Sequence, residues 1–261
     1  IAGNSEMDAV FTYDKEYLLS IARPISVSLP LQEESFSVGT TRNFFEGLLP
    51  EGFSRKSVAS YIKANENDYL TLLAALGNEC LGAIKVVEEE VKNTEARYEP
   101  LSLKQVKALA AEGATASTEI LMQTHLSLTG ASGKVGLYYD ERNLKWYLPK
   151  GDAPSTHIVK QSHVRLNRIV LNELLCIKTA EGIGIEVPES FIVNVGEGED
   201  SDILYATRRY DRCIEGGKSI SNLQAPNRLH QEDFAQALGI SSADKYEKED
   251  SGYLAKMFNL V

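Results

Sequence analysis

Hydrophobic and polar positions in the first 115 residues alternate between the spacings of strands and of short helices. Three apolar runs have the length and alternation of strands, at 10–13, 25–29 and 80–87. Four segments repeat apolar residues three and four positions apart, as helices do, at 44–49, 58–62, 69–76 and 103–110. Ser102 supplies a cap for the last helix, and Pro50 and Gly77 end two of the others. Residues 1–115 are therefore predicted to form an α/β subdomain.

A stretch of small residues, Gly113–Ser117, is the best candidate for a linker. Beyond it the order is strand, loop, strand, strand and helix over 126–182, and further strands follow near 191–195 and 204–207. This order predicts an antiparallel sheet with one helix. The predicted fold class is α+β, with one region at 1–115 and a second at 116–261.

A glycine-bearing loop, a strand lysine and a helix glutamate follow one another in the second region. The loop at 127–134 leads into an apolar run, Lys160 ends a later apolar run, and Glu173 lies in the helix. Glycines let backbone N–H groups approach phosphates closely. A lysine brings positive charge to the phosphates, and a glutamate holds that lysine in place. In this order the three features indicate the ATP site of a protein-kinase-like N-lobe.

Each feature alone has a simpler interpretation. The loop lacks both the G-x-x-x-x-G-K-[ST] and the G-x-G-x-x-G spacing, so Gly130 and Gly133 are equally consistent with a hairpin turn. Most strand lysines lie at edges or surfaces, and most helix glutamates are solvated. However, Glu173 lies in an apolar segment with Asn172 as its only polar neighbour. A carboxylate in such surroundings is costly unless it is paired, which favours the ATP-site interpretation.

Several multi-residue motifs, in one order along the chain, resemble the HipA family of bacterial serine/threonine kinases, the toxins of HipBA-type toxin–antitoxin systems. The motifs of the second region are Ser127-Leu-Thr-Gly-Ala-Ser-Gly-Lys134, Leu148-Pro-Lys-Gly151, Pro154 to Lys160, Asn172-Glu173, Arg209-Tyr-Asp-Arg212, Arg228 to Phe234, Gln236 to Gly239 and Lys245-Tyr-Glu247. Those of the first region are Ser26 to Leu31, Phe44 to Gly52 and Gly82-Ala-Ile84. The resemblance covers nearly the whole chain.

This resemblance implies a HipA N-terminal subdomain followed by a kinase-type N-lobe, with ATP and Mg²⁺ as cofactors. Lys160 and Glu173 take the catalytic ion-pair positions. The residues placed at the nucleotide are Gly130, Ala131, Ser132, Gly133, Lys134, Lys160, Arg208, Arg209 and Tyr210. The last three would act through backbone groups that pair with adenine, since the family often has an acid where this chain has Arg208. The alternative is that Arg208 and Arg209 form an exposed strand end and that Asp211 makes a local ion pair with Arg212.

In the family, a serine at the position of Ser127 is a self-phosphorylation site that silences the kinase. The catalytic aspartate and the metal-binding residues of the family lie further on, in a helical C-lobe. The chain begins with Ile1, and residues 245–261 hold no H-x-x-x-N or D-F-D-like motif. We therefore expect this chain to be an N-terminal portion that largely lacks the C-lobe. We assign none of its residues as a metal ligand, and we expect it to transfer no phosphoryl group by itself.

Composition narrows the range of partners. The formal charge of −10 argues against direct contact with nucleic acid, whose phosphates repel an acidic surface. The three cysteines are widely spaced and odd in number, so they indicate buried reduced thiols and not a disulfide framework or a zinc site. No apolar run reaches 18 residues and no secretory signal is visible, which predicts a cytoplasmic protein without a membrane segment.

The predicted function is transfer of the ATP γ-phosphoryl group to a serine or threonine of a protein, in a toxin–antitoxin context. By resemblance, the partner is a HipB-like helix-turn-helix antitoxin, and DNA is reached only through it. An aminoacyl-tRNA synthetase, specifically glutamyl-tRNA synthetase, is one candidate protein substrate. The alternative from another class is a non-catalytic or split toxin module whose role is to bind an antitoxin.

Overall fold

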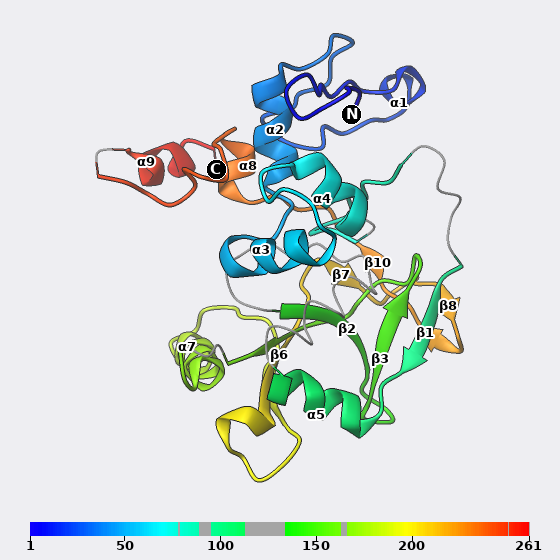
Figure 1. The fold of residues 1–261 in the computed structure, drawn as a ribbon, viewed down its shortest axis with the longest axis vertical. Helices are drawn as coiled ribbons and strands as arrows, with labels where there is room; N and C mark the ends of the chain where they lie inside the picture. Colours follow the sequence, from blue (N-terminus) through cyan, green and yellow to red (C-terminus); the bar gives the residue numbers. More distant parts are fainter. Residues whose placement is uncertain (78, 89–94, 113–133, 163–165, 250, 261) are drawn as a thin grey trace.

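The computed structural model describes residues 1–77, 79–88, 95–112, 134–162, 166–249 and 251–260 (Figure 1). Its helices are α1 (Lys15–Leu19), α2 (Val38–Glu46), α3 (Gly52–Tyr61), α4 (Tyr69–Leu76), α5 (Leu103–Glu112), α7 (Ile169–Gly182), the 3-10 helix η1 (Asp200–Asp202), α8 (Phe234–Ala237) and α9 (Tyr253–Phe258). Its strands are β1 (Arg97–Pro100), β2 (Lys134–Asp140), β3 (Lys145–Lys150), β4 (His157–Gln161), β5 (Ser190–Asn194), β6 (Ile203–Arg208), β7 (Arg212–Cys213), β8 (Ser219–Ile220), β9 (Leu223–Gln224) and β10 (Asn227–Arg228).

One antiparallel sheet organises the second region and takes in β1 from the first region, where no strand was predicted at 97–100. Its strand order is β1-β3-β2-β4-β6-β5, and the short strands form two further two-stranded ladders, β7 with β10 and β8 with β9. Strands β2, β4, β5 and β6 and the helix α7 lie where the apolar runs predicted them. The prediction of a mixed α/β chain with an antiparallel sheet is thus confirmed.

The first region departs from its predicted strands. Residues 10–13, 25–29 and 80–87 form no strand, and only isolated bridges join Ala2 to Val10 and Ser26 to Leu29. The reason is that their polar groups bond elsewhere: the Phe11 N–H donates to Thr41 Oγ1 at 2.9 Å, and the Tyr13 hydroxyl donates to the Leu29 carbonyl at 2.6 Å. The apolar runs therefore include buried residues such as Tyr13 and Leu29, but they gave the wrong backbone conformation, and Val27 and Val87 within them are exposed.

The predicted helices of the first region are present, and local caps explain their starts. The Ser37 and Asp68 side chains accept backbone N–H groups at the beginnings of α2 and α4, from Thr40 and Thr71. Ser102 does the same for α5, because its hydroxyl accepts the Gln105 N–H at 3.3 Å. The helix predicted at 44–49 begins earlier than expected, at Val38, because Ser37 supplies the cap. It also ends earlier, at Glu46, so Pro50 does not end it.

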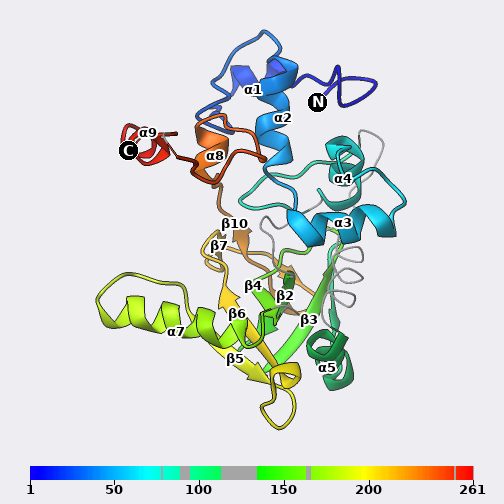
Figure 2. The ribbon, with the colours of Figure 1, turned by 60° about the vertical axis from the view of Figure 1, so that its left-hand side comes forward.

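A continuous hydrophobic core joins the two predicted regions. The buried side chains of Phe44, Leu72 and Leu76 from the first region belong to the same cluster as Leu137 and Leu204 from the sheet. Figure 2 shows α3 next to the sheet and α4 beyond it, with α7 and α5 on either side of the sheet. The boundary near residue 115 lies outside the described residues, and the two-domain division stays a prediction.

The segment around α8 returns to the first region and lies beside α2 in both views (Figures 1 and 2). The Gln236 side chain donates to the Phe44 carbonyl at 3.0 Å, and the Asn43 side chain donates to the Gly239 carbonyl at 2.7 Å. The Glu232 carboxylate accepts the Ser26 hydroxyl at 2.5 Å. These polar contacts hold this late segment against the first region.

Helix α7 lies at the surface, which corrects one premise of the sequence argument. Val170 is its only buried residue, and the helix contacts β4, β5 and β6 along one side. Glu173 is therefore not enclosed by apolar neighbours: its side chain is 33% exposed. Cys176 is likewise exposed and Cys213 only partly buried, so of the three free cysteines only Cys80 is buried as predicted.

Candidate functional site

The central feature of the site is an ion pair between β4 and α7. The Lys160 ammonium donates to the Glu173 carboxylate, and it also lies 5.6 Å from the centre of the Tyr205 ring. Both charged side chains are partly exposed, at 21% and 33%. The strand fixes the lysine and the helix fixes its partner, so the ammonium position depends on how α7 sits on the sheet.

Lys134 lies directly opposite Lys160 on the neighbouring strand, since β2 and β4 pair these two residues in register. Burial, and after it the positive charge of Lys160, lowers the pKa of Lys134 to about 8. Two like charges opposite each other in an antiparallel pair are unfavourable. Two neighbouring ammonium groups also make this place favourable for an anionic ligand.

Both lysines line a cavity of about 310 Å³ beside the end of β6. Its other described lining residues are Leu81, Ile158, Pro188, Thr207, Arg208, Arg209, Tyr210, Asp211, Gln231, Glu232 and Asp233. The volume is within the range of small-molecule pockets. Apolar residues and a few convergent charges together suit a ligand with a flat apolar part and an anionic part.

The backbone of residues 208–210 forms one wall of this cavity. The Arg208 N–H donates to the Glu189 carbonyl and the Arg209 N–H donates to the Thr156 carbonyl, each at 2.9 Å. The Tyr210 N–H makes no hydrogen bond with any described residue, and its side chain is 73% exposed. Of the three predicted adenine-pairing positions, Tyr210 thus offers the N–H donor that remains available.

The arginine side chains at this wall are already paired with carboxylates. Arg208 turns away to form ion pairs with Glu141 and with Glu189, the latter at 3.1 Å. Arg209 is buried, and its guanidinium donates to both carboxylate oxygens of Asp211, at 2.9 and 2.7 Å. The alternative of an exposed strand end is therefore wrong for Arg209, while the backbone role of both arginines stays a prediction.

A buried charge cluster, formed by Glu79, Arg209, Asp211 and Arg212, was missed by the sequence analysis. Glu79 accepts hydrogen bonds from Arg209 at 3.3 Å and from Arg212 at 2.9 Å, and the Asp211 carboxylate forms an ion pair with Arg212 at 2.9 Å. The prediction of a local Asp211–Arg212 surface pair was incomplete, since both residues are buried. The alternation of charged Arg209 and Asp211 around Tyr210, directly after a buried strand, was the available signal.

Carboxylates and guanidiniums balance within the charge cluster. Burial raises the pKa of Glu79, but the guanidiniums of Arg212 and Arg209 outweigh burial and hold that pKa below its ordinary value. Burial also raises the pKa of Asp211, and the hydrogen bonds and charge of Arg209 again bring the net shift downward. Both acids are therefore ionised at neutral pH, and the cluster of two acids and two arginines is neutral.

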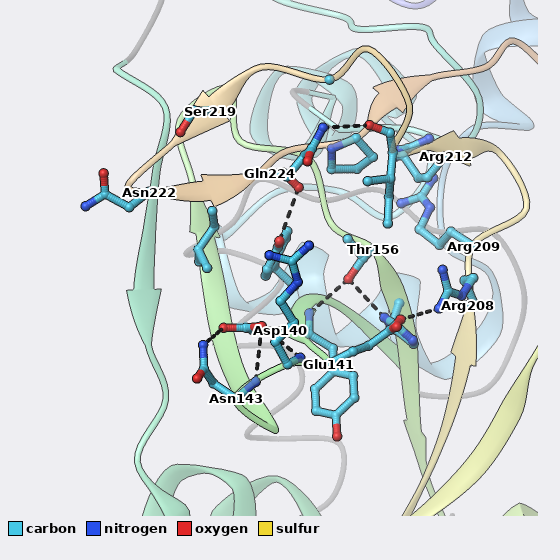
Figure 3. A pocket seen from close by; sticks show the side chains of 18 residues that line it. Asp140, Glu141, Asn143, Thr156, Arg208, Arg209, Arg212, Ser219, Asn222 and Gln224 are labelled. Atoms are coloured by element: carbon cyan, nitrogen blue, oxygen red, sulfur yellow. Dashed lines mark hydrogen bonds and ion pairs between the residues drawn. The ribbon is translucent and has the colours of Figure 1, made fainter.

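A larger cavity of about 610 Å³ shares only Arg208 and Arg209 with the smaller one among the described residues. Figure 3 shows Glu141 reaching Arg208 and Asp140 bonded to Asn143 in the β2–β3 turn. The lining of the larger cavity includes Thr156 and residues of the β8–β9 hairpin, but neither Lys160 nor Lys134. We therefore place the candidate site in the smaller cavity, because the convergent lysines and the ion pair are there.

Several predicted residues cannot be compared with the structure. Ser127, Gly130, Ala131, Ser132 and Gly133 lie outside the described residues. Within the parts of the chain that the structure describes, no three histidine, cysteine or acidic side chains come together as a metal site. In those same parts, none of the helices has the length and apolarity needed to cross a membrane.

Comparison with known protein families places this geometry in context. The family model of the HipA N-terminal domain matches residues 2–87, and that of the HipA-like C-terminal domain matches residues 126–261. The second match alone covers more than half of the chain. The chain therefore belongs to the HipA family.

Its relatives include proteins named as kinases. The putative kinase Y4mE of Sinorhizobium fredii is 30% identical over 245 residues, which are 91% of this chain and 56% of that protein. The serine/threonine-protein kinase toxin HipA of Shewanella oneidensis is 27% identical over 229 residues, which are 86% of this chain and 49% of that protein. The chain thus spans about half the length of the curated relatives it matches.

A solved structure shares the fold. It is the complex of HipA, HipB and operator DNA from Shewanella oneidensis MR-1, with a TM-score of 0.70 and 26% identity. The similarity covers 92% of this chain and 53% of the matched chain. The arrangement of the sheet, its helices and the first region is therefore one that a HipA protein adopts.

Proposed function

We propose that this chain is the nucleotide-binding portion of a HipA-like serine/threonine protein kinase. The observation that carries the proposal is the Lys160–Glu173 ion pair beside a cavity whose other wall is the backbone of residues 208–210. Protein kinases use a strand lysine held by a helix glutamate to bring charge to the ATP phosphates. In this proposal the sheet and α7 act as the kinase-type N-lobe, and the helical C-lobe is largely outside this chain.

The residues of the cavity fit ATP in three respects. The paired lysines 134 and 160 supply charge for phosphate oxygens, Leu81 and Ile158 supply apolar surface for adenine, and the Tyr210 N–H supplies a donor to the ring. Mg²⁺ would accompany the nucleotide and neutralise charge developing on the transferred phosphoryl group. No described residue is assigned to the metal.

The remaining loop residues complete the proposal. Gly130, Ala131, Ser132 and Gly133 would aim backbone N–H groups at the phosphates. Ser127 would be a regulatory self-phosphorylation site, because a phosphate there adds about −1.5 to −2 charges beside the ATP phosphates. Mass spectrometry of the complete gene product after incubation with ATP tests this role: an unmodified Ser127 in protein that phosphorylates another substrate would exclude it.

The proposed partner is a HipB-like helix-turn-helix antitoxin, and DNA would be reached through that protein. This is supported by the Shewanella complex, whose HipA is assembled with HipB and operator DNA. The formal charge of −10 suits a basic partner better than direct contact with DNA. The proposed substrate is a protein, with an aminoacyl-tRNA synthetase as one candidate. A non-catalytic role as an antitoxin-binding module is the second candidate function, and the same complex supports it.

Calorimetric titration of this chain with ATP and magnesium separates the two candidate functions. A nucleotide-binding portion should bind ATP with saturable heat, and the protein that contains it should phosphorylate serine or threonine. A chain that binds a HipB-like protein in gel filtration but takes up no nucleotide would instead be an interaction module. GTP serves as the control for recognition of the adenine ring.

Lys134 gives this binding a pH signature. With a pKa of about 8, roughly half of the Lys134 side chains are neutral at pH 8, and an anionic phosphate favours the charged form. ATP binding at pH 8 should therefore take up roughly half a proton, and uptake should vanish near pH 6.5, where the lysine is already charged. Calorimetry in buffers of different ionisation enthalpy measures this, with Lys134→Met as the variant that removes the uptake. Equal uptake by that variant would contradict the assignment.

A further inference from the structure

The first region of the chain reaches the candidate nucleotide pocket through residues 79–82. Leu81 is one of the lining residues of the smaller cavity. Gly82 has a φ of +69°, and a Cβ at that position would lie 2.7 Å from the backbone nitrogen of Gln231, another lining residue. Only glycine tolerates both conditions, so this segment lies directly against the pocket wall.

The same segment is hydrogen-bonded directly to Arg209 and Asp211, which also line the pocket. The Asp211 carboxylate accepts the Gly82 N–H at 2.8 Å, and the Cys80 carbonyl accepts from the Arg209 guanidinium at 3.2 Å. Glu79 accepts from Arg209, from Arg212 and from the backbone N–H of Ser155. The Arg209 guanidinium donates with all of its N–H groups, to Asp211, Glu79, the Cys80 carbonyl and the Ser155 hydroxyl. The Arg209 backbone therefore has little freedom to move.

The consequence for the pocket follows from the alternation of the chain. Arg209 and Asp211 are buried in the charge cluster, whereas Tyr210 between them is exposed and lines the pocket. The position of the Tyr210 N–H thus depends on Glu79, which binds the neighbouring Arg209 from 130 residues earlier in the chain.

We propose that residues 79–82 of the first region form part of the nucleotide pocket, with Leu81 as a ligand-contacting residue and Glu79 as a positioning residue. This inference rests on the proposed ATP binding and deepens it. Nucleotide affinity then depends on the first region. A partner that moves residues 79–82 would therefore change how tightly the nucleotide binds.

Two variants with matched controls test the proposal on this chain by titration with ATP and magnesium. Leu81→Ala removes apolar lining and should weaken ATP binding roughly tenfold. Ile84→Ala is its control, since Ile84 is a partly buried apolar residue of the same segment that packs on the core and lines neither cavity. Glu79→Gln keeps the side-chain shape but removes the charge, and should weaken ATP binding about tenfold.

The control for Glu79→Gln is Glu46→Gln, at a carboxylate that also receives two arginines, Arg42 and Arg55, but lines neither cavity. Thermal unfolding of each variant is measured first, and titrations are made well below the lowest midpoint. Since a purely structural role would lower stability in both glutamine variants alike, weaker ATP binding in Glu79→Gln alone supports positioning. Should Glu79→Gln fail to fold, Leu81→Ala against Ile84→Ala decides the matter.

The outcomes separate the two levels of the argument. If the unmodified chain binds no ATP, the proposed function fails and this inference fails with it. If the unmodified chain binds ATP and both Leu81→Ala and Glu79→Gln bind it equally well, the proposed function stands, and the pocket does not include the first region.

Discussion

Replacing Lys160 with alanine should lower phosphoryl transfer by the complete gene product on the order of 100-fold or more, while the fold is retained. Removing one group that stabilises transition-state charge typically costs a factor of about 10² to 10³ in rate. Lys160 is partly exposed and leaves behind only the partly exposed Glu173, so stability should change little. Steady-state kinetics measures the loss of transfer, and thermal unfolding of the same variant measures its stability.

Glu173→Gln should be milder than Lys160→Ala, because the lysine charge stays and only its anchor is weakened. Lys178→Ala is the matched control for Lys160→Ala. It also removes a lysine from an ion pair, but Lys178 lies on α7 and its pair with Glu181 is exposed. Activity of Lys160→Ala close to that of Lys178→Ala would show that the ion pair of β4 and α7 serves structure alone.

Replacing Arg209 with alanine should lower the free energy of unfolding by about 3 to 5 kcal/mol. The substitution leaves Glu79 and Asp211 buried with one guanidinium between them, and an uncompensated buried charge has a cost of about this size. Arg97→Ala is the control: its exposed pair with Glu99 should be worth about 1 kcal/mol or less. Urea unfolding at neutral pH compares the two.

The effect of Arg209→Ala should shrink in acid. Glu79 and Asp211 have folded-state pKa values below their ordinary values of 4.5 and 3.8. A depressed acid pKa contributes stability that is present above the ordinary value and is lost as the pH falls through the folded-state value. The difference between wild type and variant should therefore be constant near neutral pH and narrow below about pH 4.5. A difference that stays constant into acid would mean that the arginine acts through packing alone.

The sheet and the ion pair could be predicted because their signals are local. The apolar runs of β2, β4 and β6 are long enough to mark strands, and the order of Lys160 and Glu173 follows a known arrangement. The reasoning behind Glu173 was nevertheless partly wrong, since its helix lies at the surface. The pairing followed from chemistry between two elements, and not from burial of the acid.

The charge cluster and the conformation of the first region could not be predicted, because they depend on distant contacts. Nothing near Glu79 in the sequence shows that its partners are Arg209 and Arg212. Similarly, the run at 10–13 is apolar enough for a strand, but whether it becomes one depends on a neighbour with free backbone groups. In the structure the Phe11 N–H donates to the Thr41 side chain and the Phe11 carbonyl accepts the Phe36 N–H, so neither group pairs with a strand.

The contact between α8 and α2 bears on how the chain folds during synthesis. Gln236 and Phe44 are 192 residues apart, so at translation rates of roughly 5 to 20 residues per second α2 waits roughly 10 to 40 s for its neighbour to be made. Throughout that interval the surface of α2 that α8 later covers stays open to solvent or to other nascent chains. A topology that joins early and late segments in this way favours slow folding and gives molecular chaperones time to act on the young chain.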